Sequence, residues 1–299
     1  MTASEPVRRY TLPNRLEIAY QSKAELLQFY EDIFEKQVYT SRGVTLRDGD
    51  TVFDVGANIG LFTVFVAERW PGAQIYSFEP APPLFAILRA NTVRYGDRVH
   101  LFNCGLSSAA GEARLTFYPH SSGMSSFYPD ERLESAALRT LIHNELARGR
   151  GEIEELLAFE DELIEQRLRS ETWSCPLRTL EEVIGEQGVT RIDLLKIDVE
   201  KSEMDVLAGL DSADWSKVGQ AVVEVHDLGS RLVDIQRMFR DHGFAVSVEQ
   251  EELYQSSDRY NLYALRRHLR SDHAASLERI EERAKRLRDS LHRMPGTRK

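Results

Sequence analysis

The spacing of apolar residues changes repeatedly along the chain, and each change marks the border of an expected element. Short apolar runs such as 51–55 (TVFDV) and 192–197 (IDLLKI) are typical of buried strands. Apolar residues three and four positions apart, as in 23–36, are typical of one face of a helix. Strands that alternate with helices of about a dozen residues predict right-handed βαβ units and a parallel sheet.

The same patterns, with turn residues such as Asp48-Gly49 as borders, predict a doubly wound α/β fold with a mostly parallel sheet. We expect a short strand or hairpin arm at 12–20. We expect further strands at 51–55, 74–78, 99–103, 113–118, 192–197, 221–225, 245–249 and 262–265. We expect helices at 23–36, 61–69, 82–95, 180–187, 202–210, 232–242 and 275–291.

One long segment interrupts the alternation of strands and helices. Residues 121–172 begin with a polar loop and continue as a charged, mostly helical stretch, which we expect to form an insertion or lid. The chain then divides into an N-terminal strand and helix segment (1–46), the α/β domain with its insertion (47–267) and a basic C-terminal helix or tail (268–299).

Composition and charge exclude several classes of protein. The net charge of −10 argues against nucleic acid as the main partner, because phosphate binding needs a basic surface. No apolar run approaches the roughly 20 residues that span a bilayer, and the N-terminus lacks the apolar core of a signal peptide, so we expect a cytoplasmic protein. Two cysteines cannot form a disulfide framework.

The loop after the first strand of the α/β domain is the first candidate site. Asp54, Gly56, Asn58 and Gly60 fall where a glycine-bearing loop lets a cofactor approach the backbone. The second strand ends at Glu79, which can accept hydrogen bonds from two ribose hydroxyls. The loop departs from G-x-G-x-x-G, and its acidic residue suits a cofactor with an ammonium and a sulfonium better than a pyrophosphate. These residues favour S-adenosylmethionine over a dinucleotide.

A second candidate site lies at the ends of two later strands. Asp198 and Glu200 follow one strand and should share a side, and Glu224 and His226 do the same on the next. We therefore expect all four side chains beside the cofactor. Because a hydroxyl is a poor nucleophile near neutral pH, His226 is the predicted general base, with Glu224 or Glu200 orienting it. Alternatively, Asp198, Glu224 and His226 bind a divalent cation that activates the acceptor oxygen.

The segments VFDVGANIGLFT, SFEPAP, LLKIDVEKSEMDVLAGL and VVEVHD, in this order, resemble the FkbM-type methyltransferases. They are most similar to the O-methyltransferases associated with polyketide and nonribosomal peptide synthases, and the resemblance covers roughly residues 14–266. It implies a class I Rossmann-like fold, S-adenosylmethionine as the methyl donor and an oxygen nucleophile. It also implies contacts between Cys104, Gly105 and Leu106 and the adenine.

Several methyl acceptors are compatible with the sequence. The resemblance favours a polyketide or peptide hydroxyl, free or bound to an acyl or peptidyl carrier protein, and the basic tail could contact an acidic carrier. A metal-dependent O-methyltransferase acting on a free small molecule or a sugar hydroxyl is the first alternative. An NAD(P)-dependent oxidoreductase and a non-catalytic module that binds S-adenosylmethionine are the others.

Overall fold

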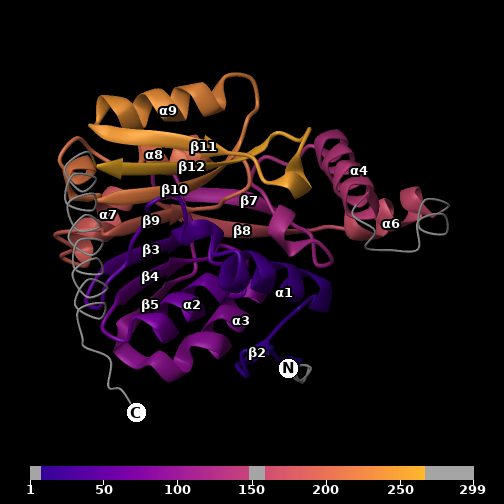
Figure 1. The fold of residues 1–299 in the computed structure, drawn as a ribbon, viewed down its shortest axis with the longest axis horizontal. Helices are drawn as coiled ribbons and strands as arrows, with labels where there is room; N and C mark the ends of the chain where they lie inside the picture. The colour runs from indigo at the N-terminus through magenta and orange to yellow at the C-terminus, as the bar shows by residue number, and fades with distance from the viewer. Residues whose placement is uncertain (1–7, 148–158, 267–299) are drawn as a thin grey trace, which may run out of the picture.

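The computed structural model of this protein describes residues 8–147 and 159–266. The expected C-terminal helix at 275–291, the tail at 268–299 and the middle of the insertion lie outside the described residues. A seven-stranded sheet in the order β11-β12-β10-β9-β3-β4-β5 forms the centre of the described part (Figure 1). Its strands are β3 (Thr51–Val55), β4 (Gln74–Phe78), β5 (Val99–Phe102), β9 (Leu194–Ile197), β10 (Gln220–His226), β11 (Phe244–Glu249) and β12 (Arg259–Arg266).

The direction of the strands confirms the predicted α/β class. Neighbours from β5 to β10 are parallel, whereas β12 runs antiparallel to both β10 and β11. The strand order reverses between β3 and β9, which is the topological switch point where open α/β sheets bind their ligands. The carboxyl ends of these two strands therefore position the site.

Helices cover the central sheet on both faces, because successive side chains of a strand point to opposite sides. On one face Val52 and Ile75 belong to the same core cluster as Leu26, Phe62 and Leu84, which come from α1, α2 and α3. On the other face a second cluster joins the strands to α7, α8 and α9. The helices are α1 (Lys23–Tyr30), α2 (Leu61–Arg69), α3 (Pro82–Thr92), α4 (Glu131–Ala147), α6 (Glu160–Arg167), α7 (Leu180–Glu186), α8 (Glu203–Ala208) and α9 (Arg231–Asp241).

The sequence patterns missed a second sheet. Strands β6 (Gly105–Leu106), β7 (Gly111–Phe117) and β8 (Glu171–Arg178) form it in the order β6-β8-β7. Only β7 was expected. Strand β8 begins at the end of the segment that we expected to be helical, and it contains Pro176, a residue that argues against a strand. An N-terminal hairpin pairs β1 (Arg9–Thr11) with β2 (Glu17–Ala19), so the segment 12–20 contains a hairpin arm, one of the two forms expected for it.

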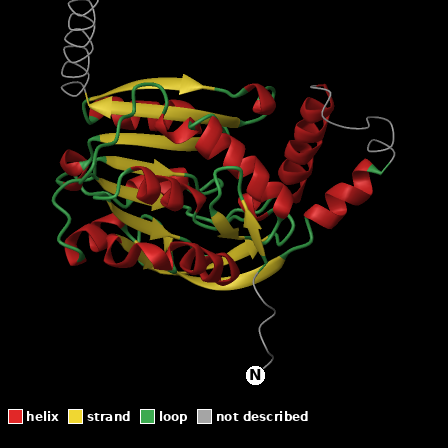
Figure 2. Ribbon diagram, turned by 60° about the horizontal axis from the view of Figure 1, so that its bottom comes forward, coloured by secondary structure: helices red, strands yellow, loops and turns green. Residues whose placement is uncertain are grey.

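The insertion contains two described helices, α4 and α6. Both views show them standing beside the central sheet, on the side toward which its parallel strands point (Figures 1 and 2). Leu138 and Leu141 of α4 and Arg167 of α6 line the main cavity, so the insertion forms part of its wall. None of the described helices is long and apolar enough to cross a membrane.

Candidate active site

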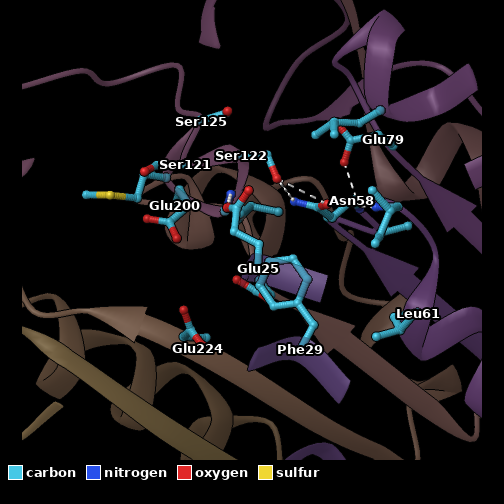
Figure 3. A pocket seen from close by; sticks show the side chains of 18 of the residues that line it. Glu25, Phe29, Asn58, Leu61, Glu79, Ser121, Ser122, Ser125, Glu200 and Glu224 are labelled. Atoms are coloured by element: carbon cyan, nitrogen blue, oxygen red, sulfur yellow. Dashed lines mark hydrogen bonds between the residues drawn. The ribbon is translucent and has the colours of Figure 1, made fainter. Parts of the chain in front are cut away.

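A cavity of about 420 Å³ opens at the carboxyl ends of β3, β4, β9 and β10. The glycine-bearing loop, the loop after β9 and the segment 121–125 surround it, and the N-terminal helix α1 closes one side (Figure 3). Its size is that of a site for a cofactor-sized molecule. Of the expected site residues, Asp54, Gly60 and His226 do not line it, whereas the other expected residues do.

The glycine-bearing loop needs the backbone freedom of glycine at two positions. Gly56 has φ of 78°, and a Cβ atom there would lie 1.7 Å from the carbonyl oxygen of Asp198. Gly60 has φ of 86° and lies against Leu88 of α3, where a Cβ atom would be 2.5 Å from the leucine Cδ1. Gly56 thus brings the loop close to the end of β9, and Gly60 lets α2 pack closely on α3.

Glu79 is buried at the end of β4 and is held by backbone groups on both sides. Its Oε1 accepts from the N–H of Ala81, and its Oε2 accepts from the N–H of Asn58, each at 2.8 Å. Burial raises the pKa of Glu79 to about 7, although these two N–H groups oppose the shift. The carboxylate is fixed at the cavity wall with lone pairs left for further donors.

Cys104, Gly105 and Leu106 line another part of the cavity wall. Cys104 and Leu106 are buried, and burial raises the pKa of the Cys104 thiol to about 11, so it stays protonated near neutral pH. Gly105 faces Phe127 and Leu177, where a Cβ atom would lie less than 3 Å from both side chains. This part of the wall is formed by small and apolar residues and leaves no room for a side chain at position 105.

A buried lysine organises the two strands at the switch point. Lys196 of β9 lies with its Nζ 3.0 Å from the carboxylate of Asp54 and 3.6 Å from that of Asp198, and it donates to the carbonyl of Gly56 at 2.7 Å. Asp54 also accepts a hydrogen bond from Thr63 and has no exposed surface. Asp54 therefore stabilises the glycine-bearing loop through Lys196. We expected Asp54 to contact the cofactor directly, but its side chain does not line the cavity.

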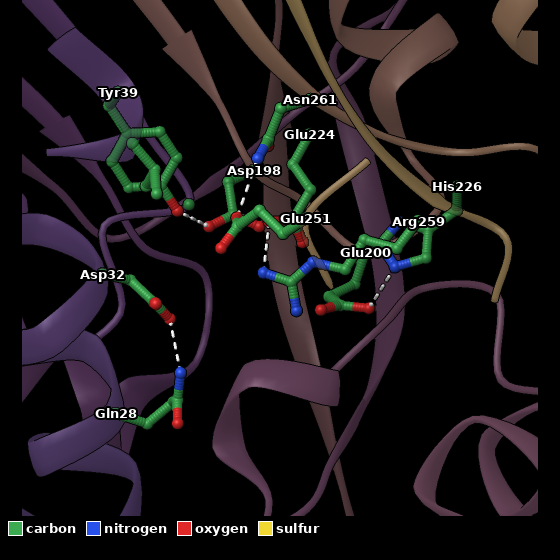
Figure 4. A network of polar contacts seen from close by, with 12 residues as sticks. Gln28, Asp32, Tyr39, Asp198, Glu200, Glu224, His226, Glu251, Arg259 and Asn261 are labelled. Carbon is green, nitrogen blue, oxygen red and sulfur yellow. Dashed lines mark hydrogen bonds and ion pairs between the residues drawn. The ribbon is translucent and has the colours of Figure 1, made fainter. Parts of the chain in front are cut away.

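Asp198 accepts a side-chain hydrogen bond from Tyr39 and lies near the cations of Lys196 and Arg259. The phenol of Tyr39, which precedes β3, donates to its Oδ2 at 2.8 Å (Figure 4). Burial alone would raise the pKa of Asp198, but Lys196 and Arg259 outweigh burial and lower it. Asp198 is therefore an ionised carboxylate that ties the N-terminal segment to the end of β9.

Glu224 is buried on β10 and faces the cavity. Arg259, on the antiparallel neighbour β12, donates to its Oε2, while its Oε1 is buried without a hydrogen-bond partner among the described residues. Burial raises the pKa of Glu224 to about 8, and the guanidinium of Arg259 only partly opposes this shift. A carboxyl group with this pKa exchanges protons near neutral pH.

His226 ends β10, and both of its ring nitrogens face carboxylates. Nε2 lies 3.1 Å from Glu200 (Figure 4), and Nδ1 lies 3.0 Å from Glu203, the first residue of α8. Burial alone would lower the pKa of His226, but the two carboxylates outweigh burial and raise it well above its usual range. The ring is therefore a cation near neutral pH, and this geometry favours a positioning role for His226 over direct proton transfer.

The chain after β9 is not the extended strand end that we expected. Glu200 and Lys201 have φ of 47° and 80°, and this turn directs the Glu200 side chain back toward His226. The Nζ of Lys201 lies 2.5 Å from the Glu134 carboxylate of α4, and both side chains are buried. The insertion is thus joined to the turn that carries Glu200.

Three expected site residues form the one group of possible metal ligands within the described ranges. Single ligand atoms of Glu200, Glu224 and His226 lie within 4.8 Å of one another. Asp198, which we had placed in such a set, lies outside the group. A metal would have to displace a proton from His226, and the raised pKa of His226 opposes this change. The guanidinium of Arg259 next to Glu224 would also repel a cation there.

Several site residues were not found from the sequence. Lys196 carries a signal, since a charged side chain in a buried strand is rare without a partner. Arg259 reaches the site only because β12 pairs antiparallel with β10, where it lies opposite His226. Tyr39 and Glu203 have neighbours that depend on tertiary packing, which no local pattern predicts.

The strand order, the glycine-bearing loop at the switch point and Glu79 at the end of β4 together define the class I methyltransferase fold. The family of methyltransferase FkbM domains matches residues 54–246. The chain belongs to the FkbM family of S-adenosylmethionine-dependent methyltransferases, as the sequence motifs predicted. The dehydrogenase alternative is therefore wrong.

Two curated relatives are similar over most of this chain. The 31-O-demethyl-FK506 methyltransferase FkbM of Streptomyces tacrolimicus is 41% identical over 88% of this chain and 98% of its own length. The AMB antimetabolite synthetase AmbE of Pseudomonas aeruginosa is 42% identical over 95% of this chain, which spans 13% of that synthetase. A crystal structure of methyltransferase FkbM from Methylobacillus flagellatus KT matches with a TM-score of 0.48 and 14% identity, over 76% of this chain and 47% of that one.

Proposed function

We propose that this protein transfers a methyl group from S-adenosylmethionine to a hydroxyl of a polyketide or nonribosomal peptide type substrate, either free or bound to a carrier protein. The O-methyltransferase relative, named for the 31-O position of its substrate and matched over nearly its whole length, supports the oxygen acceptor. The similar region of an antimetabolite synthetase supports a natural-product substrate and a carrier-bound form of it.

The unpartnered Oε1 of Glu224 is the observation that carries the proposal. A buried carboxylate oxygen without a donor is costly, and a bound hydroxyl would supply the missing hydrogen bond. A pKa of about 8 makes the same carboxylate a fitting general base for that proton. As the acceptor oxygen gains the methyl group, its proton passes to Glu224.

The residues around the cavity fit S-adenosylmethionine. Glu79 would accept hydrogen bonds from the ribose hydroxyls. The apolar wall of Cys104, Gly105 and Leu106 would contact the adenine. The backbone of Gly56 and Asn58 would lie next to the rest of the cofactor. When bound, S-adenosylmethionine supplies an electrophilic methyl group on a sulfonium. Asp198 and Glu200 would contribute negative charge beside that cation.

The remaining charged residues would orient the base. Arg259 donates to one carboxylate oxygen of Glu224, so the other oxygen would face the acceptor. The His226 cation would fix the side chain of Glu200 by an ion pair. In this arrangement His226 would act through Glu200 as a positioning residue.

Intact-mass analysis of acceptors after incubation with S-adenosylmethionine tests the proposal. Matched free and carrier-bound hydroxy acids should be assayed together, and one of them should gain one methyl group. Measurable cofactor binding without methyl transfer to either form would support the non-catalytic alternative instead.

A metal-dependent O-methyltransferase is the second candidate function. The close approach of Glu200, Glu224 and His226 is the observation that favours it. In that case the cation, rather than Glu224, would lower the pKa of the acceptor hydroxyl. The acceptor could then be a free small molecule or a sugar.

A further inference from the structure

Glu25 is a carboxylate of the N-terminal segment that extends into the same cavity as Asn58 and Glu79 (Figure 3). It belongs to α1, about 30 residues before the glycine-bearing loop. Its Oε1 accepts a hydrogen bond from the N–H of Gly123 at 3.0 Å. Its Oε2 is buried and has no hydrogen-bond partner among the described residues.

The charge of Glu25 is poorly balanced by its surroundings. Burial raises its pKa. The backbone of Gly123, the backbone and hydroxyl of Ser122 and the guanidinium of Arg167 oppose the shift without cancelling it. Within the described ranges, Glu25 forms no ion pair with a neighbouring side chain. Burying a carboxylate oxygen without a hydrogen bond costs free energy. A donor on a bound ligand would offset this cost for Oε2.

The neighbours of Glu25 place it beside the glycine-bearing loop rather than beside Glu224, the proposed base. Ser122, next to its partner Gly123, accepts from the side-chain amide of Asn58 at 3.3 Å, so the two segments are joined. Asn58 in turn donates its backbone N–H to Glu79, the proposed ribose ligand. Glu25 therefore lies within the part of the cavity that the glycine-bearing loop forms.

We propose that Glu25 binds the α-ammonium of S-adenosylmethionine through Oε2. Two groups of this cofactor are cationic, but the sulfonium has no hydrogen to donate, whereas an ammonium offers three N–H donors. Only the ammonium satisfies both the charge and the missing hydrogen bond of Oε2. This inference rests on the proposed function, because it takes S-adenosylmethionine as the ligand.

Calorimetric binding of three ligands tests the assignment without any acceptor. S-adenosylmethionine carries both cations, S-adenosylhomocysteine carries the ammonium alone, and the deamino analogue 5′-S-(3-carboxypropyl)-5′-thioadenosine carries neither. Glu25→Gln should weaken the first two by about 10- to 100-fold, the range of a charged hydrogen bond. It should leave the deamino analogue unchanged.

A matched control comes from the same segment. Glu35 is exposed in the π-helical turn η1 (Glu31–Glu35) and does not line the cavity, so Glu35→Gln should bind all three ligands as the unchanged protein does. If Glu25→Gln fails to fold, Glu25→Ala provides the same comparison without the polar side chain.

The remaining outcomes separate this inference from its premise. A loss confined to S-adenosylmethionine would assign Glu25 to the sulfonium, and an equal loss for all three ligands would make its role structural. Either result, or full affinity in the variant, overturns the ammonium assignment while the methyltransferase proposal stands. If the unchanged protein binds none of the three ligands, the proposed function fails with it.

Discussion

Arg259 donates a hydrogen bond to one carboxylate oxygen of Glu224 and leaves the other oxygen facing the cavity. The two residues lie on adjacent antiparallel strands, β12 and β10. A guanidinium on one side fixes the direction of the carboxylate, and the free oxygen faces the space where an acceptor would bind.

Glu224→Gln should lower kcat by about 100- to 10,000-fold, the usual contribution of a general base. Cofactor affinity should stay nearly unchanged, because a base acts in the transition state. With a pKa of about 8, Glu224 is protonated below that pH, so the wild-type rate should rise as the pH increases toward 8 and then level off. Kinetics at several pH values would show the rise disappear in the variant. Glu181→Gln, an exposed change on α7, should keep both rate and profile.

His226→Gln should lower kcat less than Glu224→Gln does and should keep the rise in rate toward pH 8. The reason is that both ring nitrogens of His226 are engaged by Glu200 and Glu203, so the ring has no free lone pair to accept a proton. The same pH series on this variant is the measurement. If the rise disappears here and persists in Glu224→Gln, then His226 is the base, as its sequence context predicted.

Prolonged EDTA treatment should leave activity nearly intact, since the Arg259 guanidinium already provides the positive charge next to Glu224. Methyl transfer is measured before and after dialysis against the chelator. A collapse that magnesium or manganese restores would establish Glu200, Glu224 and His226 as metal ligands and contradict the direct mechanism.

Lys196→Met should reduce the free energy of unfolding by about 3–5 kcal/mol, because it leaves buried Asp54 without its cation. Adding Asp54→Asn should recover part of that loss, since the uncompensated charge is then removed. Urea denaturation of the single and double variants gives both values. Lys217→Met breaks a more exposed ion pair with Asp214 and should change stability by about 1 kcal/mol or less. Equal losses in Lys196→Met and Lys217→Met would contradict the buried-pair account.

The central sheet was predictable from the sequence because its strands are buried runs with clear borders. The bounds of β3, α2 and β4 agree with the expectation, and Gly60 and Pro71 mark where α2 begins and ends. The small second sheet was not predictable in the same way. Strand β8 contains Pro176 and mixes exposed with buried residues, and β6 has only two residues. Their pairing depends on long-range contacts.

The candidate site was partly predictable for a related reason. Carboxyl ends of parallel strands meet at one edge, so the approach of Glu200, Glu224 and His226 followed from the strand assignments. The role of each residue did not follow, because it depends on partners from elsewhere in the chain. Glu203 occupies one nitrogen of His226, and Arg259 occupies one oxygen of Glu224.

The buried ion pair between Lys201 and Glu134 limits how this enzyme can be recombined with its relatives. A chimera whose foreign insertion has no carboxylate in the place of Glu134 leaves the Lys201 ammonium buried without its partner, one residue from Glu200. The unpaired charge would destabilise the turn at the end of β9 rather than the exchanged helix. The insertion and position 201 therefore form one exchangeable unit, and a chimera should take both from the same parent.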